Sequence, residues 1–350
     1  MLMKSLVQVC GRKSGICLNR AQQKGEQKIL SSPAKVSFPG KRWHKNTAIF
    51  GILLYAISLF NLISCIHFRE KTYLDVYQGE PISFAEMMES LTKARLVYIG
   101  ENHTLKRHHR FQHEVIKALY QDKIPMAIGL EMLPFTCQSH LDAWIEGGVG
   151  KKEFLTRINW KKNWGIDFGL YEPIFNFARE KKIRLLALNV PRFLVKKVAR
   201  KGLSGLTEEE KGMLPLITPS SEEQRRYLAL SLSRHKTLGR ESEQYIYEAQ
   251  DVWDSTMSHY VVEYLKSDEG KNSTVVVLTG SGHMVYGYGI PMRVARALDL
   301  PYRIVIPTSS GDITFQKEWE KYIEQAELTH EEFHFIQKPI ADFIFLVPLR

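Results

Sequence analysis

The sequence predicts an α/β fold: a mostly parallel sheet with helices on both faces and an α-helical insertion. Apolar runs of five to seven residues recur along the chain, and segments with helical periodicity separate them. Because continuous apolar strands are buried on both faces, such runs are typical of parallel sheets covered by helices. The predicted strands are Arg95–Gly100, Met126–Glu131, Ile183–Asn189, Thr274–Gly280, Tyr302–Pro307 and Phe343–Pro348.

The intervals between these runs favour helices. Glu241–Leu265 has the clearest period, with Ile246, Ala249, Trp253 and Met257 on one stripe. Residues 195–240 are charged and carry no strand signal, so we expect a helical insertion there, within one domain spanning 91–350. The other predicted helices are Leu105–Gln121, Thr136–Gly147, Tyr171–Lys181, Arg192–Lys201 and Pro291–Leu298.

The formal charge of +10 is unevenly distributed along the chain. Ten of the 48 basic residues, but only one of the 38 acidic residues, precede Cys65, which leaves a net charge of +1 from that residue onward. A nearly neutral domain lacks the basic footprint of nucleic-acid binding proteins, so we expect no nucleic-acid partner.

An uncharged segment, residues 47–64, follows the basic run 41–45 and ends at Cys65. This order is typical of an export signal, and Leu62–Cys65 resembles the lipobox of bacterial lipoproteins, whose cysteine is lipidated. The interpretation makes 1–64 the export signal, with an unusually long basic start, and 65–90 a lipidated tether. It places the protein in the bacterial cell envelope, outside the cytoplasm and at the outer membrane. The alternative is an uncleaved membrane helix. Cys137 is then the one further cysteine after Cys65, so no internal disulfide is expected.

Two predicted strands end in the same motif. Gly100–His103 follows the first strand, and Gly280–His283 follows the run Thr274–Gly280. Because ligands bind at the carboxyl ends of parallel strands, we expect both imidazoles to share one site. A single Gly-x-x-His turn is weak evidence, since the histidine can be an ordinary loop residue, whereas two of them indicate a site.

Further polar residues are predicted at the same edge. Glu131 and Asn189 close strands, and Glu101 lies within the first turn. A buried acid must be paired, so Glu131 is either a site residue or the partner of a buried cation. His108 and Gln112 share a helical row that points toward the site, while the next row, His109 and His113, is expected to be solvated.

Two later segments add candidates. Gln250 and Asp254, four residues apart, either line the site or cap a neighbouring strand. Arg293 lies near a predicted helix start, where the helix dipole is unfavourable for a cation. We therefore expect an anion beside Arg293, either a ligand carboxylate or Glu101 and Glu131. The chain has no phosphate-binding glycine loop and no Gly-x-Ser-x-Gly nucleophile turn.

Taken together, these motifs resemble the ChaN-like family of haem-binding uptake lipoproteins within the Tiki/ChaN superfamily. The resemblance covers residues from about Leu91 to Pro307. It implies that the chain binds haem and acts in iron acquisition. The motifs are GENH at Gly100–His103, HHRFQ at His108–Gln112, GLE at Gly129–Glu131, LNVP at Leu188–Pro191, AQDVWDSTM at Ala249–Met257 and GSGHMVYGYGIPMR at Gly280–Arg293.

Haem iron takes an axial His or Tyr, and the candidates for haem contact are His103, His108, Gln112, His283, Tyr286, Tyr288 and Arg293. The aromatic residues Trp164, Phe168 and Tyr171 either contact a porphyrin or pack in the core. The rival interpretation is a hydrolase, which the Tiki proteases and erythromycin esterases of the superfamily suggest. In it, Glu101, His103, Glu131 and His283 hold zinc or manganese or activate water. The sequence leaves a homodimer open.

Overall fold

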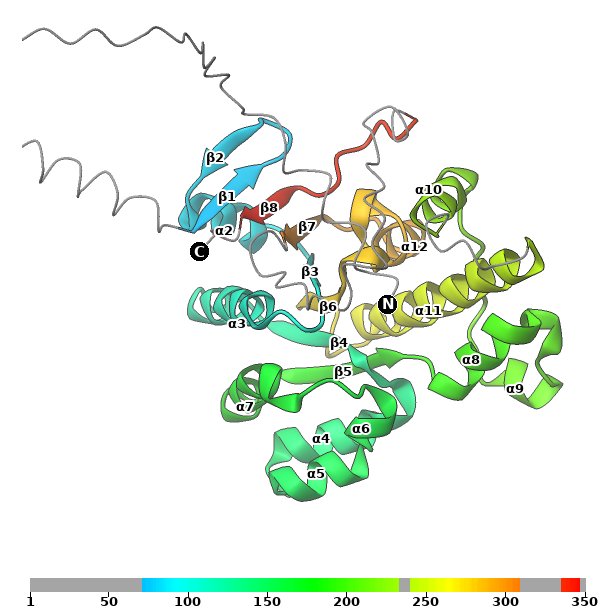
Figure 1. The fold of residues 1–350 in the computed structure, drawn as a ribbon. Coiled ribbons are helices and arrows are strands. Elements are labelled where there is room, and N and C mark those ends of the chain that lie inside the picture. The colour runs from blue at the N-terminus through cyan, green and yellow to red at the C-terminus, as the bar shows by residue number, and fades with distance from the viewer. Residues whose placement is uncertain (1–70, 233–239, 309–334, 347–350) are drawn as a thin grey trace, which may run out of the picture. The chain divides into compact units, whose positions relative to one another are not determined.

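The computed structural model describes residues 71–232, 240–308 and 335–346. Among them eight strands form one mixed sheet, in the order β2-β1-β8-β7-β3-β6-β4-β5 (Figure 1). The six strands from β8 to β5 pair in parallel, and β1 pairs antiparallel with both β8 and β2. The strands are β1 (Thr72–Asp75), β2 (Glu80–Ile82), β3 (Leu96–Glu101), β4 (Met126–Pro134), β5 (Arg184–Asn189), β6 (Thr274–Gly280), β7 (Tyr302–Pro307) and β8 (Phe343–Leu346).

Helices cover both faces of the sheet, as the apolar runs predict. Alternate residues of β3 belong to two different cores: Val97 and Ile99 pack on one face, Leu96 and Tyr98 on the other. The first face carries α2 (Phe84–Thr92), α3 (Lys106–Gln121), α4 (Gln138–Glu146), α5 (Lys151–Arg157), α6 (Trp160–Asn163) and α7 (Glu172–Lys181), and the second carries α11 (Arg240–Lys266) and α12 (Ile290–Ala297). An α/β fold with a mostly parallel sheet is thus confirmed.

The described part of the segment between β5 and β6 contains helices and no strand. It contains α8 (Arg192–Lys201), α9 (Glu208–Gly212) and α10 (Glu222–Leu232) before α11 begins. A third apolar cluster, which includes Leu194, Val198 and Val252, holds α8 against α11. The predicted helical insertion is therefore present, and it packs beside the carboxyl end of β5.

The structure adds a hairpin that the sequence did not predict. Strands β1 and β2 contain four and three residues, too few to show a period, and they lie within the stretch 65–90 that was expected to be a tether. Helix α2 also begins there, fixed by a capping box between Ser83 and Glu86. From Thr72 onward this stretch belongs to the folded domain.

The predicted export signal and Cys65 lie outside the described residues, so those expectations stay predictions. Within the described part of the chain, no helix is both long and apolar enough to cross a bilayer.

Candidate functional site

The two Gly-x-x-His turns lie side by side. Strands β3 and β6 are neighbours in parallel register, with Gly100 opposite Thr279 and Glu101 opposite Gly280. A Cβ atom added to Gly100 would lie 2.5 Å from Oγ of Ser281, so only glycine leaves room for the second turn. The structure thereby brings His103 and His283 to the same edge of the sheet.

One carboxylate lies between the two imidazoles. Oε1 of Glu131, from β4, is 3.5 Å from Nε2 of His283 and 4.0 Å from Nε2 of His103. The other oxygen of Glu131 accepts a hydrogen bond from the backbone N–H of Gly280. Glu131 therefore joins the ends of β3, β4 and β6 into one polar cluster.

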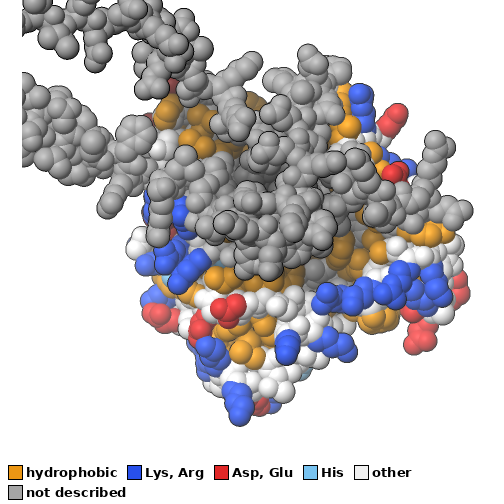
Figure 2. Space-filling model, in the orientation of Figure 1, with side chains coloured by type: hydrophobic (Ala, Val, Ile, Leu, Met, Phe, Trp, Pro, Cys, Tyr) orange, Lys and Arg blue, Asp and Glu red, His pale blue; other side chains and the backbone are white. Residues whose placement is uncertain are grey.

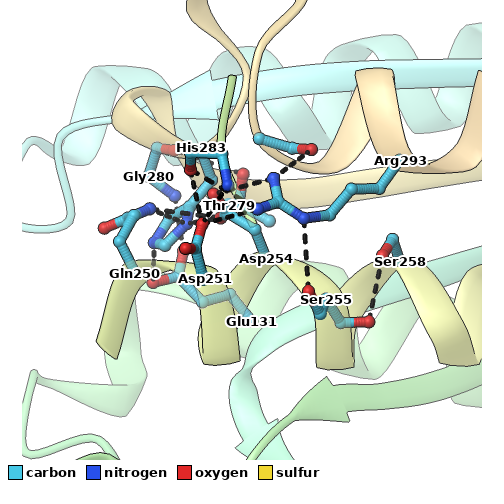
Figure 3. Close-up of polar contacts among 12 residues, drawn as sticks. Glu131, Gln250, Asp251, Asp254, Ser255, Ser258, Thr279, Gly280, His283 and Arg293 are labelled. Atoms are coloured by element: carbon cyan, nitrogen blue, oxygen red, sulfur yellow. Dashed lines mark hydrogen bonds and ion pairs between the residues drawn. The ribbon is translucent and has the colours of Figure 1, made fainter. Parts of the chain in front are cut away.

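A second carboxylate orients each histidine through its other nitrogen. Nδ1 of His103 lies 2.7 Å from Oε1 of Glu101. Nδ1 of His283 lies 2.6 Å from Oδ1 of Asp254, as Figure 3 shows. A carboxylate that binds Nδ1 fixes the orientation of the imidazole ring, so that Nε2 points away from that carboxylate. Both Nε2 atoms consequently face the region around Glu131.

Glu101 is fully buried and has four polar neighbours. The hydroxyl of Tyr171 and the amide of Gln112 donate to it at 2.7 and 2.8 Å, and Nδ1 of His109 lies at 3.4 Å. Burial raises the pKa of Glu101, but hydrogen bonds from His103 and His109 outweigh that effect and hold its pKa far below the ordinary value. Glu101 is therefore ionised at neutral pH.

Burial and neighbouring charges also oppose each other at the histidines, where the net result is a raised pKa. Burial lowers the pKa of His283, but the charges of Glu131 and Asp254 outweigh burial and raise the pKa to about 10. For His103 burial also lowers the pKa, and Glu131 and Glu101 outweigh it, so the pKa lies above its ordinary value. The carboxylates Glu101 and Glu131 thus have lowered pKa values and the imidazoles raised ones, because each stabilises the charged form of the other.

Arg293 has the anionic partners that its helix position requires, but not the expected ones. Nη2 lies 2.8 Å from Oδ1 of Asp251, and Nη1 lies 3.5 Å from Oδ2 of Asp254. The guanidinium also donates to the backbone oxygens of Gly289 and Thr218. The partners are therefore not Glu101 and Glu131, because α11 supplies two buried acids beside α12, and a ligand carboxylate near Arg293 stays a prediction.

Three other predicted site residues, His108, Tyr286 and Tyr288, lie outside the cluster. Nδ1 of His108 accepts a hydrogen bond from the N–H of Asn102, and its Nε2 donates to the backbone oxygen of Thr308, so His108 braces the turn. Tyr286 and Tyr288 pack against Tyr227 on the α12 side of the sheet. These two tyrosines belong to the apolar cluster on that face rather than to the polar edge.

Several residues that the structure brings to the cluster were misjudged or missed from the sequence. His109 was expected to be solvated, but it is buried against Glu101, because the β3 turn curls over the start of α3. Asp254 and Gln250 belong to the cluster and do not cap a strand. Tyr171 was expected to contact a porphyrin or to pack in the core, and its hydroxyl donates to Glu101. Asp251 carried no signal of its own. The signal that could have identified Asp251 is its spacing of four residues from Ser255, because both side chains lie on the face of α11 that contacts Arg293.

The arrangement can hold and move protons. Three imidazoles and four carboxylates lie within one connected network, and the side chain of His103 is 21% exposed while that of His283 is 9% exposed. No group of three or more His, Cys, Asp or Glu residues within the described ranges is arranged to hold a metal ion. The groups of this cluster can exchange protons, and His103 has the most exposed of the three imidazole side chains.

These features define a class: an α/β protein with a polar site at the carboxyl edge of its parallel strands, built on two Gly-x-x-His turns. Residues 87–294 match the family model described as haem-binding uptake, Tiki superfamily, ChaN. That match covers more than half of the chain, and the chain belongs to this family.

The fold also resembles that of solved structures. A structure described as "Cofacial heme binding to ChaN of Campylobacter jejuni" matches with a TM-score of 0.59 and 20% identity, over 79% of this chain and 96% of that one. A mutant of the erythromycin esterase EreC, in its open conformation, matches with a TM-score of 0.40 and 14% identity, over 68% of this chain and 76% of that one.

Among curated proteins, the chloroplastic Protein RETICULATA-RELATED 5 of Arabidopsis thaliana is 24% identical over 296 residues. The alignment covers 78% of this chain but 37% of the relative, so this chain spans little more than a third of that protein's length.

Proposed function

We propose that this chain binds haem at the carboxyl edge of the sheet, with Nε2 of His103 as axial ligand, and serves haem uptake at a membrane. The observation that carries the proposal is the position of His103. Of the three histidines considered as axial ligands, it has the most exposed side chain, whereas His108 and His283 are buried. Its Nδ1 is already held by Glu101, which favours ligation through Nε2.

The surroundings of His103 fit a haem that lies across the carboxyl edge of the sheet, which we call the rim. The ring of Trp164 meets the His103 ring edge-on, with centroids 4.6 Å apart, and limits its rotation. Two cavities, of about 540 and 290 Å³, lie at the opposite edge of the sheet, where β7 and β8 begin, and Arg303 and Asp342 line both of them. A bound haem would supply the iron that His103 ligates, while Glu101 would keep the imidazole in place.

A homodimer belongs to the same proposal. The Campylobacter jejuni structure is described as showing cofacial haem binding, an arrangement with two haem faces together. A haem that lies across an open rim leaves its second face uncovered, and the rim of a second chain would cover it. We therefore expect haem to increase the mass of the particle from one chain to two, measured by light scattering with and without haemin.

The direct test is an absorption titration of the full chain with haemin. We expect a shifted Soret band that saturates near one haem per chain, and a loss of at least tenfold in affinity for His103→Ala. His259→Ala is the matched control, because His259 is exposed on α11 and lies outside the cluster. If both variants bind haemin like the unchanged chain, His103 is not the axial ligand.

A hydrolase is the second candidate, and Glu131 favours it. A carboxylate placed between two oriented imidazoles is more than haem transfer requires, and a His–carboxylate pair can act as a general base toward water. As the side chains lie, both Nδ1 atoms contact carboxylates, so zinc or manganese would need Nε2 of His103 and His283 with Glu131. Metal analysis of the purified chain tests this: stoichiometric metal together with an unchanged Soret band would favour the hydrolase.

We further propose that residues 1–64 are an export signal that is removed, and that lipid on Cys65 attaches the domain to a membrane outside the cytoplasm. An acid-poor N-terminal stretch is also typical of organelle transit segments, and the Arabidopsis relative is named chloroplastic. Lipid labelling of the full chain and of Cys65→Ser decides between them. Labelling that depends on Cys65 supports the lipoprotein, whereas removal of the N-terminal stretch by a chloroplast import reaction supports the organelle.

A further inference from the structure

The outward half of α8 is entirely basic apart from one aromatic residue. Leu194, Val195 and Val198 are buried against α11, which leaves the other half of the helix facing outward. That half carries Arg192, Phe193, Lys196, Lys197, Arg200 and Lys201, and α8 contains no acidic residue. This helix is therefore amphipathic, with a basic face and an apolar face.

Two lysines from α6 extend this surface. Nη1 of Arg192 donates to the backbone oxygen of Lys162 at 3.0 Å, which places α6 beside the start of α8. Lys161 and Lys162 are both exposed. We call the set Lys161, Lys162, Arg192, Phe193, Lys196, Arg200 and Lys201 the basic face. Figure 2 shows Lys and Arg side chains gathered over α8, at the right of the view.

The cations of the basic face are not neutralised. Lys197, their neighbour on α8, pairs with Glu210, and Glu208 of α9 pairs with Lys211. Within the described residues, none of the six cations of the basic face pairs with a carboxylate. The near-neutral charge of the whole domain therefore conceals a local surface that attracts anions.

Apolar side chains are exposed in the same part of the molecule. Phe193 is 54% exposed and Leu216 is 89% exposed, although the neighbours Leu214 and Ile217 pack into the cluster that holds α8. Exposed phenylalanine and leucine among lysine and arginine are typical of helices that lie in the headgroup region of anionic membranes. A nucleic acid would use the cations but would gain nothing from an exposed Leu216.

The topology places the basic face at the same edge of the sheet as the point where the chain enters the domain. Thr72 is opposite Leu346, the last residue of β8, and β8 is parallel to β7, so β1 begins at the carboxyl edge. Helix α8 begins three residues after Asn189, at the carboxyl end of β5. Both features therefore lie on the edge that carries His103 and His283.

The connection between the domain and the proposed anchor is short. Five residues, 66–70, separate Cys65 from Lys71, and six residue steps span at most roughly 20 Å. If lipid on Cys65 is embedded in a bilayer, as proposed above, the carboxyl edge must lie near the membrane surface.

We propose that the basic face docks on an anionic lipid bilayer, so that the edge carrying His103 and His283 faces the membrane. Headgroup phosphates contact the cations of α8 and α6, and Phe193 enters the headgroup layer. The lipid on Cys65 limits how far the domain can move from the membrane, and the basic face determines the orientation of the domain.

The test measures how fast an amine-reactive reagent modifies individual lysines of the full chain, reconstituted in vesicles and read by mass spectrometry. Vesicles of phosphatidylcholine with phosphatidylglycerol are compared with vesicles of phosphatidylcholine alone. We expect Lys196 and Lys201 to react at least roughly fivefold more slowly in the anionic vesicles, and high salt to remove the difference. Lys93, exposed at the end of α2, is the internal control and should react equally in both.

Two variants test the mechanism of docking. Arg192→Glu/Arg200→Glu should abolish the protection of Lys196 and Lys201, whereas Lys117→Glu/Lys123→Glu, the same charge change on and just after α3, should leave it intact. Phe193→Ser should reduce the protection without changing the charge. Circular dichroism of each variant checks that the helices remain.

Equal reaction rates of Lys196 and Lys201 in the two kinds of vesicle would overturn the proposal. So would protection by a single-stranded RNA but not by anionic vesicles, which would assign the basic face to nucleic acid. Neither readout depends on haem, so the proposed haem site can fail while the docking surface stands, or the reverse.

Discussion

The two Gly-x-x-His turns have the same motif but different surroundings. His103 takes its orienting carboxylate, Glu101, from its own turn, and its side chain is 21% exposed beside Trp164. His283 takes its carboxylate, Asp254, from α11, and its side chain is 9% exposed. The first turn therefore presents its imidazole at the rim, while the second fixes an imidazole inside the protein.

This difference distinguishes the contribution of the motif, which places a histidine at the sheet edge, from that of the surrounding helices, which determine its exposure. In both turns the glycine lets the chain leave the strand and place His at the sheet edge. Whether that His can reach a ligand depends on the helix that packs above it. The insertion and α11 cover the second turn, and the network of Arg293, Asp251 and Asp254 holds that cover in place.

The largest effect is expected from Arg293→Met, which removes the cation that only the second turn has. Asp251 and Asp254 would remain buried without their partner, and breaking a buried pair costs about 3–5 kcal/mol. Arg296→Met, on the exposed side of α12, is the control and should change stability by less than about 0.5 kcal/mol. Urea unfolding of both variants measures the difference. A loss below about 1 kcal/mol for Arg293→Met would show that the network does not hold α11.

Replacement of each histidine by glutamine tests the comparison directly. His283→Gln leaves Glu131 and Asp254 without their shared cation and should cost about 3 kcal/mol, whereas His103→Gln should cost less than about 1 kcal/mol, because Tyr171, Gln112 and His109 still contact Glu101. Thermal unfolding at neutral pH ranks the two variants. Equal losses would mean that the two turns are equivalent.

The unfolding temperature should also depend on pH through His283. Its pKa is raised to about 10 in the folded protein, above the ordinary 6.5. Its contribution to stability is therefore complete below pH 6.5 and is lost as the pH rises through about 10. The unfolding temperature of the unchanged chain should fall across that window, and His283→Gln should show a smaller fall. An identical profile for both would assign the fall to other groups.

Gly100→Ala tests the contact between the turns. The new Cβ would meet the side chain of Ser281, and overpacking of this kind typically costs about 1–3 kcal/mol. Adding Ser281→Gly should recover most of the loss, because it removes the atoms that collide. A double variant no more stable than Gly100→Ala would place the strain elsewhere.

The smallest effect concerns haem and pH. Iron takes the neutral imidazole, while the carboxylates beside His103 raise its pKa. Protons therefore compete with iron, and haem affinity should rise with pH by at most about tenfold per unit, or about 1.4 kcal/mol, until His103 is neutral. Haemin titrations across neutral pH measure this. An affinity that falls as pH rises would contradict ligation by His103.

The sequence predicted the sheet and the pairing of the two turns because both have strong local signals. Apolar runs mark β3 and β6, and each motif lies at the end of its run. The partners of the turns were harder to predict. Asp254 lies 29 residues from His283 on a helix whose rotation depends on packing, and Tyr171 reaches Glu101 from 70 residues away. The hairpin β1–β2 is too short to show a pattern, and His109 is buried by a turn geometry that helical periodicity does not specify.

Glu131 gives the cluster one property that neither turn has alone. Oε1 of Glu131 faces the Nε2 atoms of both histidines. A ligand that binds Nε2 of His103 would end its interaction with Glu131, so Glu131 would interact with His283 alone. His283 in turn contacts Asp254 on α11. We therefore expect occupancy of the rim to be linked to the position of α11, and such linkage is reciprocal. Anything that shifts α11 should change the affinity of the rim by the same factor by which the ligand shifts α11.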